Sequence, residues 1–227
     1  TVLRSMYRIG SKELTMKKIY IALTTCIALG ITGCIDMKDN SLRTNPNDPL
    51  NFNNVFADYF SRPNGSVENG WLGDLAFCML ANNHMEFAPT AAMSKYIHHT
   101  FTAGVYTYAK FTITLGPTCD GTITVKLGSA ANPDMLCVKA SKAALPTDLY
   151  IGSGDNPPGW VMALSTSTPY VVELSSINCA AGTATLTVNG TVKGQYSFSP
   201  GPQFDKVTVY SWINNVGHQL DDIVIRK

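Results

Sequence analysis

The sequence predicts an all-β protein, an antiparallel β-sandwich, and three observations carry that prediction. Short runs of alternating apolar and polar residues recur along the chain, clusters of Gly, Pro, Asn and Ser separate them, and almost no segment has the period of a helix. Many short strands joined by turns are typical of two antiparallel sheets packed face to face. This folded domain is expected to span residues 55–227.

Residues 16–33 have the pattern of a secretory signal. A Met-Lys-Lys start is followed by residues 19–33, which contain no charged residue. That run is too short to cross a membrane as a stable helix, which needs about 20 apolar residues, and its order is that of a segment removed from the mature protein. Residues 1–15 precede this start and are interpreted as an upstream extension of the reading frame.

The signal ends in the stretch ITGC, whose last residue is Cys34. This stretch resembles the lipobox of bacterial lipoproteins, in which a small residue precedes a cysteine that takes up lipid and becomes the new N-terminus. The resemblance implies lipidation at Cys34 and a place in a bacterial cell envelope, at the outer membrane or the cell surface. The alternative is an ordinary signal with an incidental cysteine, like Cys26. Residues 34–54, rich in Asp, Asn, Ser and Pro, are expected to form a flexible tether.

Size and charge limit the classes of function. Counted from Cys34, the chain has 194 residues, which suits one domain and a tether. The same residues include 12 Lys and Arg against 15 Asp and Glu, a net charge of −3, with no basic cluster. Nucleic acid is therefore not expected as a partner, because its binding needs a concentrated positive surface.

Four more cysteines follow, an even number in a chain expected to reach an oxidising compartment: Cys78, Cys119, Cys137 and Cys179. Two disulfides are the natural interpretation, and three connectivities are open. Pairing of Cys119 with Cys137 is favoured, because these two flank a hairpin-like segment. A zinc site is the alternative, but neither Cys-x-x-Cys spacing nor a His pair at ligand spacing accompanies the cysteines.

The clearest strands lie in the middle of the domain. KFTITL (residues 110–115) and TITVKL (residues 122–127) each place apolar side chains on one face and polar side chains on the other. Turn-forming residues occupy 116–121 between them. Residues 74–86 are the only segment that fits a short helix, and a strand fits there nearly as well.

Further strands are predicted towards the C-terminus. Asn189-Gly190 stands between two alternating segments and predicts a type I′ hairpin, because both central residues of that turn must accept a positive φ. YVVELSS, DKVTVYSW and LDDIVIR are similar short runs separated by turn formers.

The start of the domain, FADYFSRPNGSVENGW (residues 56–71), is similar to the start of concanavalin A-like, or laminin G-like, jelly-roll domains. These begin with an Asp-x-Phe-x-Arg segment that leads to a Gly-Ser turn and a Trp. QLDDIVIRK (residues 219–227) resembles the last strand of that family, and TATLTVNGTV (residues 183–192) resembles the hairpin before it. The resemblance implies a jelly-roll β-sandwich. The matching residues of the first motif are Asp58, Phe60, Arg62, Gly65, Ser66 and Trp71.

That family includes glycan-binding lectins, adhesion modules and glycoside hydrolases, and fold does not fix function. Its hydrolases resemble one another in a Glu-x-Asp-x-x-Glu strand, because retaining hydrolysis needs two carboxylates that face one bond. This chain has no such run, and Asp221 and Asp222 would point to opposite faces of a strand. The glutamates after Cys34 each stand alone: Glu68, Glu86 and Glu173.

Nucleophilic catalysis has no better support in the sequence. No Gly-x-Ser-x-Gly motif occurs, and the four histidines have no obvious acidic or thiol partner. The sequence therefore predicts that the protein is not an enzyme, and a hydrolase would require a carboxylate pair that converges only in space. The histidines are His84, His98, His99 and His218.

The resemblance also implies a structural Ca²⁺ between the first and last strands, held by oxygen ligands. Asp58 and Asp222 are the candidate partial ligands. In the alternative interpretation, Asp58 accepts hydrogen bonds from the backbone or Arg62, and Asp222 is a surface residue.

The candidate ligand-binding residues lie in and after KVTVYSW. If the valines of this run face the core, Tyr210 and Trp212 point away from it, and flat aromatic faces stack on the apolar faces of sugars. The alternative is that a loop covers the pair, which then fills a second small core. Trp160 and Trp71 are expected to pack inward. The loop after the pair would add hydrogen-bonding groups from Asn214, Asn215 and His218.

The sequence thus predicts a lipid-anchored, non-catalytic protein of the cell envelope whose β-sandwich binds a carbohydrate or another surface ligand. The alternative is a structural, assembly or adhesion subunit that acts through protein contacts or self-association. A glycoside hydrolase is the least favoured class.

Overall fold

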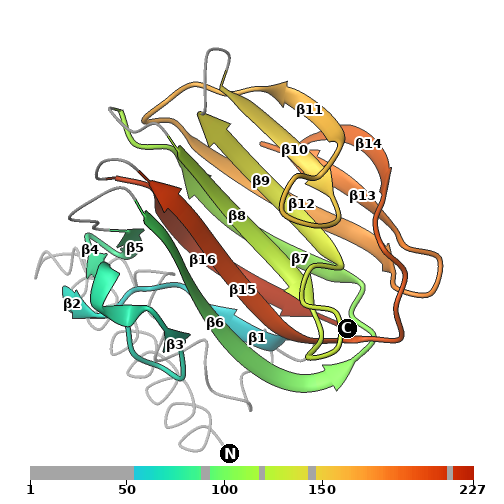
Figure 1. Cartoon of the computed structure of the whole chain (residues 1–227), viewed down its shortest axis with the longest axis horizontal. Helices are drawn as coiled ribbons and strands as arrows, with labels where there is room; N and C mark the ends of the chain where they lie inside the picture. Colours follow the sequence, from blue (N-terminus) through green and yellow to red (C-terminus); the bar gives the residue numbers. More distant parts are fainter. Residues whose placement is uncertain (1–53, 88–92, 118–120, 143–146, 214–216) are drawn as a thin grey trace, which may run out of the picture. The chain divides into compact units, whose positions relative to one another are not determined.

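The computed structural model describes residues 54–87, 93–117, 121–142, 147–213 and 217–227. These residues form two antiparallel sheets (Figure 1), which confirms the predicted β-sandwich. The predictions for residues 1–53, which include the signal, the tether and Cys34, lie outside them. No helix in the described part is long and apolar enough to span a membrane.

The first sheet has nine strands and is antiparallel in each pairing. β16 lies near its middle and also pairs with β1. In sheet order the strands are β14 (Thr191–Ser197), β13 (Thr183–Val188), β12 (Pro169–Asn178), β7 (Tyr108–Thr114), β16 (Gln219–Arg226), β5 (His84–Phe87), β4 (Cys78–Ala81) and β2 (Gly65–Ser66), with β1 (Asn54–Asp58) beside β16.

The second sheet has seven strands, also antiparallel. Its long strands run side by side in Figure 1, and its outer face carries the candidate site. In sheet order they are β11 (Gly159–Ala163), β10 (Asp148–Gly152), β9 (Leu136–Lys142), β8 (Gly121–Gly128), β15 (Phe204–Ile213), β6 (Met93–Gly104) and β3 (Leu72–Gly73).

The core lies between the sheets and follows from the alternation in the sequence. Phe111 and Ile113 of β7 and Ile123 and Val125 of β8 are buried in one continuous apolar cluster. The predicted short helix is a single 3₁₀ turn, Leu75–Phe77, followed by β4 and β5. A short apolar run beside a turn does not distinguish helix from strand, and here the pairing of β4 with β5 selects the strand.

The predicted hairpin is present between β13 and β14. Asn189 and Gly190 have φ values of 49° and 75°, and Val188 pairs with Thr191 across the turn. Both central residues therefore have the positive φ that a type I′ turn requires.

The prediction of two disulfides is wrong for the cysteines that the structure describes. Cys78, Cys137 and Cys179 are buried free thiols. Cys78 is in β4 and Cys179 follows β12, with three strands of the sheet between them, whereas Cys137 is in the other sheet. A disulfide needs Cα atoms within about 7 Å, which this placement does not provide for Cys78 and Cys179. Cys119 lies outside the described residues.

Candidate functional site

Tyr210 and Trp212 lie on the outer face of the seven-stranded sheet, with the orientation that the alternation predicts. Val207, Val209 and Ser211 point inward and are fully buried. Trp212 is 37% exposed, so neither a second core nor a covering loop hides it. The ligand-binding role of the pair stays a prediction.

Strand register places the side chain of Tyr210 in a row that crosses this sheet. Each residue of the row is the direct partner of the next, so all point to the outer face. The row has aromatic rings at both ends and polar groups in the middle. From β6 to β11 it consists of Tyr96, Tyr210, Thr124, Lys139, Tyr150 and Trp160.

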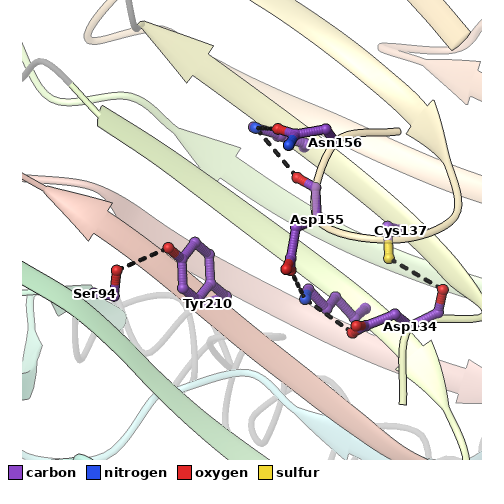
Figure 2. A network of polar contacts seen from close by, with 8 residues as sticks. Ser94, Asp134, Cys137, Asp155, Asn156 and Tyr210 are labelled. Atoms are coloured by element: carbon purple, nitrogen blue, oxygen red, sulfur yellow. Dashed lines mark hydrogen bonds and ion pairs between the residues drawn. The ribbon is translucent and has the colours of Figure 1, made fainter. Parts of the chain in front are cut away.

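A charged network borders this row (Figure 2). The ammonium group of Lys126 contacts the carboxylates of Asp134 at 2.9 Å and Asp155 at 2.5 Å. The ammonium group of Lys139 donates to the backbone oxygen of Asp155 at 3.2 Å and to Oδ1 of Asn156 at 2.8 Å. These contacts hold the loop between β10 and β11 against the outer face of the sheet.

The two lysines have opposite pKa shifts. Burial lowers the pKa of Lys126, but its hydrogen bonds to Asp134 and Asp155 outweigh that effect, so its pKa is raised. The pKa of Lys139 is lowered, mainly by burial and also by the positive charge of Lys126, although Asp155 opposes this shift. Among the described residues, no carboxylate forms an ion pair with Lys139.

Two contacts hold the side chain of Tyr210, one at its hydroxyl and one at its ring face. Its hydroxyl shares a hydrogen bond of 2.9 Å with Ser94 Oγ on β6 (Figure 2), and the ammonium group of Lys126 lies 5.5 Å from the centre of its ring. A cation at this distance attracts the ring face. The phenol ring is therefore held in one orientation on the sheet.

The end of the row at β10 and β11 holds an exposed tryptophan that the sequence did not predict. Trp160 is 58% exposed, which corrects the prediction that it packs inward. Its Nε1 donates to Oδ1 of Asp148 at 3.0 Å, and the Tyr150 hydroxyl donates to Oδ2 of the same carboxylate at 3.2 Å. A β-bulge between β10 and β11 reverses the expected alternation, because Leu149 pairs with Met162 but Tyr150 pairs with Trp160.

His218 is not exposed on this face. Its side chain is fully buried, and its Nδ1 accepts a hydrogen bond from the Gly116 backbone at 3.5 Å. The prediction that His218 contacts a ligand is therefore wrong, because the ring is enclosed where β16 begins. Asn214 and Asn215 lie outside the described residues.

The environment of Asp58 bears on the predicted Ca²⁺ site. This fully buried carboxylate accepts hydrogen bonds from the Phe60 backbone at 2.9 Å, Arg62 at 2.7 Å and the Trp71 indole at 2.9 Å, with Asn69 at 3.4 Å. Protein donors thus stabilise its charge, as in the alternative interpretation.

The second candidate ligand, Asp222, lies beside the β16 residue that pairs with Asp58 and has a φ of 54° at an irregularity in the strand. Within the described ranges, no three His, Cys, Asp or Glu side chains gather as a metal site. The Ca²⁺ site stays a prediction.

Comparison with known proteins yields structural similarity only. No protein-family model and no curated protein matches the chain. A sialidase aligns with a TM-score of 0.59 at 12% identity over 76% of this chain, which spans only 18% of the sialidase chain. The β-glucanase of Bacillus licheniformis has a TM-score of 0.55 at 8% identity, with 76% of this chain and 97% of that one covered. The carbohydrate recognition domain of Emp47p has a TM-score of 0.56 at 10% identity, covering 76% and 95%.

These comparisons correct the prediction that the protein is not an enzyme. Besides the sialidase and the β-glucanase, similar structures include the alginate lyase Aly36B, the Crh5 transglycosylase and a laminarinase from Flavobacterium sp. UMI-01. Enzymes are therefore among the proteins that share this sandwich. The prediction rested on the absence of one hydrolase motif, and that absence does not exclude catalysis by other residues on the same fold.

Proposed function

We propose that the protein binds a polysaccharide on the outer face of its seven-stranded sheet. The observation that carries the proposal is the row of aromatic and polar side chains across that face, with Trp212 beside it. Large aromatic rings are normally buried, because each gains free energy by leaving water. Rings that stay exposed and are held by hydrogen bonds are suited to stack on sugar rings, while accessible polar groups beside them, here Lys139, Asp155 and Asn156, meet hydroxyls.

The similar structures support this proposal by the carbohydrate activities in their names, among them a carbohydrate recognition domain and a laminarinase. The signal pattern and the cysteine at its end support a lipid anchor at Cys34 in a bacterial cell envelope. The anchored protein would then hold a polysaccharide, or another glycan-bearing surface ligand, near the membrane.

Cleavage of the bound polysaccharide is a second candidate function, and one observation favours it. Asp134 and Asp155 come from different loops yet contact the same ammonium group, at 2.9 Å and 2.5 Å. Their carboxylates are therefore close in space, as are the two carboxylates of retaining glycosidases, which lie about 5 Å apart. This is the convergence that the sequence could not display.

A glycan array tests the binding function. The purified protein should bind a subset of polysaccharides, and a Tyr210→Ala/Trp212→Ala variant should lose that binding while its melting temperature stays close to the parent's. Tyr108→Ala, on β7 of the other sheet, is a matched control that should bind normally. An empty array from folded protein would overturn the proposal, and self-association of the same sample would favour an assembly subunit instead.

The same polysaccharides test cleavage. Incubation followed by chromatography of the products should reveal shortened chains if the second candidate function is correct. An Asp155→Asn variant, in which the side chain stays similar in size, should then release far less product. Intact polysaccharide after incubation with a binding-competent sample would exclude the second function and leave the first.

A further inference from the structure

The end of the row at β10 and β11 has the construction of a second sugar-binding site. Trp160 is exposed, and Tyr150 pairs with it directly across the two strands. Both side chains donate to one carboxylate, that of Asp148, which is only 7% exposed.

We propose that Trp160 and Tyr150 form a second aromatic platform, oriented by Asp148, and that the ligand is an extended polysaccharide chain lying across the strands from β6 to β11. The inference rests on the proposed function and deepens it, because it names the class of ligand and adds a second contact site.

The carboxylate explains why the rings have fixed orientations. A buried carboxylate is costly unless donors satisfy its oxygens, and here the Trp160 indole satisfies one oxygen and the Tyr150 hydroxyl the other. Burial and the adjacent Asp148 also raise the pKa of Tyr150, so its hydroxyl keeps its proton and donates. Asp148 is therefore a positioning residue for two rings at once.

The bulge supplies the direction of Trp160. Val161 points inward and is buried, and the extra residue in β11 lets Trp160 pair with Tyr150 on the outer face. Bulges re-aim side chains, and this one exposes a tryptophan that regular alternation would have placed in line with Met162.

Register gives the length of the ligand. Tyr150 and Tyr210 are separated by three strand spacings, which is roughly 14 Å at about 4.8 Å per strand, and Tyr96 to Trp160 spans five, roughly 24 Å. A single terminal sugar cannot contact both platforms, whereas an extended chain of several sugars can. Thr124 itself is buried, so the hydrogen-bonding groups between the platforms are those of Lys139 and of the exposed Asp155 and Asn156, which it contacts.

Affinity as a function of chain length tests the inference. Array glycans of one repeating type, from disaccharide to hexasaccharide, are titrated against the parent protein, Trp160→Ala and Trp212→Ala. The parent should bind the hexasaccharide about tenfold more tightly than the disaccharide, a gain that one stacked ring can supply. Trp160→Ala should abolish this gain and keep short-chain binding, whereas Trp212→Ala should weaken binding at every length.

Two further variants separate orientation from mere presence of the ring. Trp160→Phe keeps a ring but loses the indole donor, and should recover part of the long-chain gain. Asp148→Ala should reduce the gain in affinity for long chains. It should also shift the nuclear magnetic resonance signal of the Trp160 indole proton, whereas this signal would stay unchanged if Asp148 did not orient the indole. Flat length dependence, or Trp160→Ala equal to the parent, would overturn this inference and leave the proposed function standing. Absence of binding at every length would overturn both.

Discussion

Asp58 stabilises the corner at which the chain leaves β1. Its carboxylate joins the Phe60 backbone, the Arg62 guanidinium and the Trp71 indole, so one buried side chain organises the whole Asp-x-Phe-x-Arg…Trp motif. Phe60 has a φ of 51° and is fully buried, an unusual backbone conformation for a bulky residue that these bonds hold in place. Asp58, Arg62 and Trp71 of this motif therefore stabilise a corner of the sandwich and are not members of the row at the candidate site.

Replacement of Asp58 should be strongly destabilising. Asp58→Ala removes the acceptor for the Arg62 and Trp71 donors, and loss of one member of a buried charge pair costs about 3–5 kcal/mol of unfolding free energy. Urea unfolding measures this cost, with exposed Glu68→Gln as the matched control. A loss below about 1 kcal/mol would contradict the role assigned to Asp58.

An identical melt of the parent with Ca²⁺ and with chelator would argue against the predicted ion.

His99 should make stability depend on pH. Its Nε2 bonds to the Asn69 carbonyl at 3.1 Å, and its ring lies 4.4 Å from that of Phe56. Burial lowers the pKa of His99, although the Asn69 and Thr100 backbone and Asp58 oppose the shift. The neutral ring is thus favoured in the folded state, so its contribution is complete above the unfolded pKa, about 6.5, and is lost as pH falls through the lower folded pKa.

Urea titrations at a series of pH values check this expectation. The parent should lose stability on acidification below about pH 6.5, and His99→Gln, which does not titrate, should lose less over the same range. His84→Gln, on β5 of the other sheet, is the control. Equal slopes for the parent and His99→Gln would show that another group is responsible.

The buried thiols should be unreactive. Burial, with the negative charge of Asp74 for Cys78, raises the pKa of Cys78 to about 12, and burial likewise raises that of Cys137 to about 12. The reactive thiolate is then almost absent at neutral pH. Alkylation followed by peptide mapping should modify both cysteines only after denaturation. Native labelling, or a disulfide-linked peptide that contains either residue, would refute the assignment.

At the scale of single elements, regular strands were predictable and irregular ones were not. Alternation gave the inward faces of β7, β8 and β15 because each side chain position follows from the period of two, and Asn189-Gly190 gave the hairpin. The bulge that exposes Trp160 could not be predicted from the sequence, because no turn former or break in the pattern within residues 160–164 indicates it. The burial of Lys126 could not be predicted either, because it depends on two loops that contact the strand only in the folded chain.

The contacts of Lys126 with Asp134 and Asp155 should hold the β10–β11 loop in place. Asp155 is 73% exposed, so Asp155→Ala alone should cost less than about 1 kcal/mol of unfolding free energy while cleavage of the loop by a protease becomes faster. Asp134→Ala should behave similarly. The double variant leaves buried Lys126 without either carboxylate and should cost more than the sum of the two, by about 1–2 kcal/mol. Strictly additive losses would indicate that the network does not hold the loop.

The candidate site is a property of the whole molecule, which limits what the sequence could predict of it. Tyr210 and Trp212 were identifiable because they are neighbours in one strand, whereas Tyr150, Trp160 and Lys139 join them only through the pairing of β15, β8, β9, β10 and β11. The same reasoning applies to catalysis. Asp134 and Asp155 are far from any motif in the sequence, so a search for motifs could not test a pair that forms in space.

The proposed anchor and the proposed binding face should be separable at the scale of the whole protein. If Cys34 is lipidated, the protein should partition into detergent and incorporate a labelled fatty acid in a bacterial host, and Cys34→Ala should do neither. Glycan affinity should be unchanged in Cys34→Ala, because the aromatic row is built entirely from residues of the sandwich. Cys26→Ala is the matched control and should stay lipidated. Labelling that persists in Cys34→Ala would refute the anchor, and loss of glycan affinity in that variant would mean that the outer face alone does not bind the ligand.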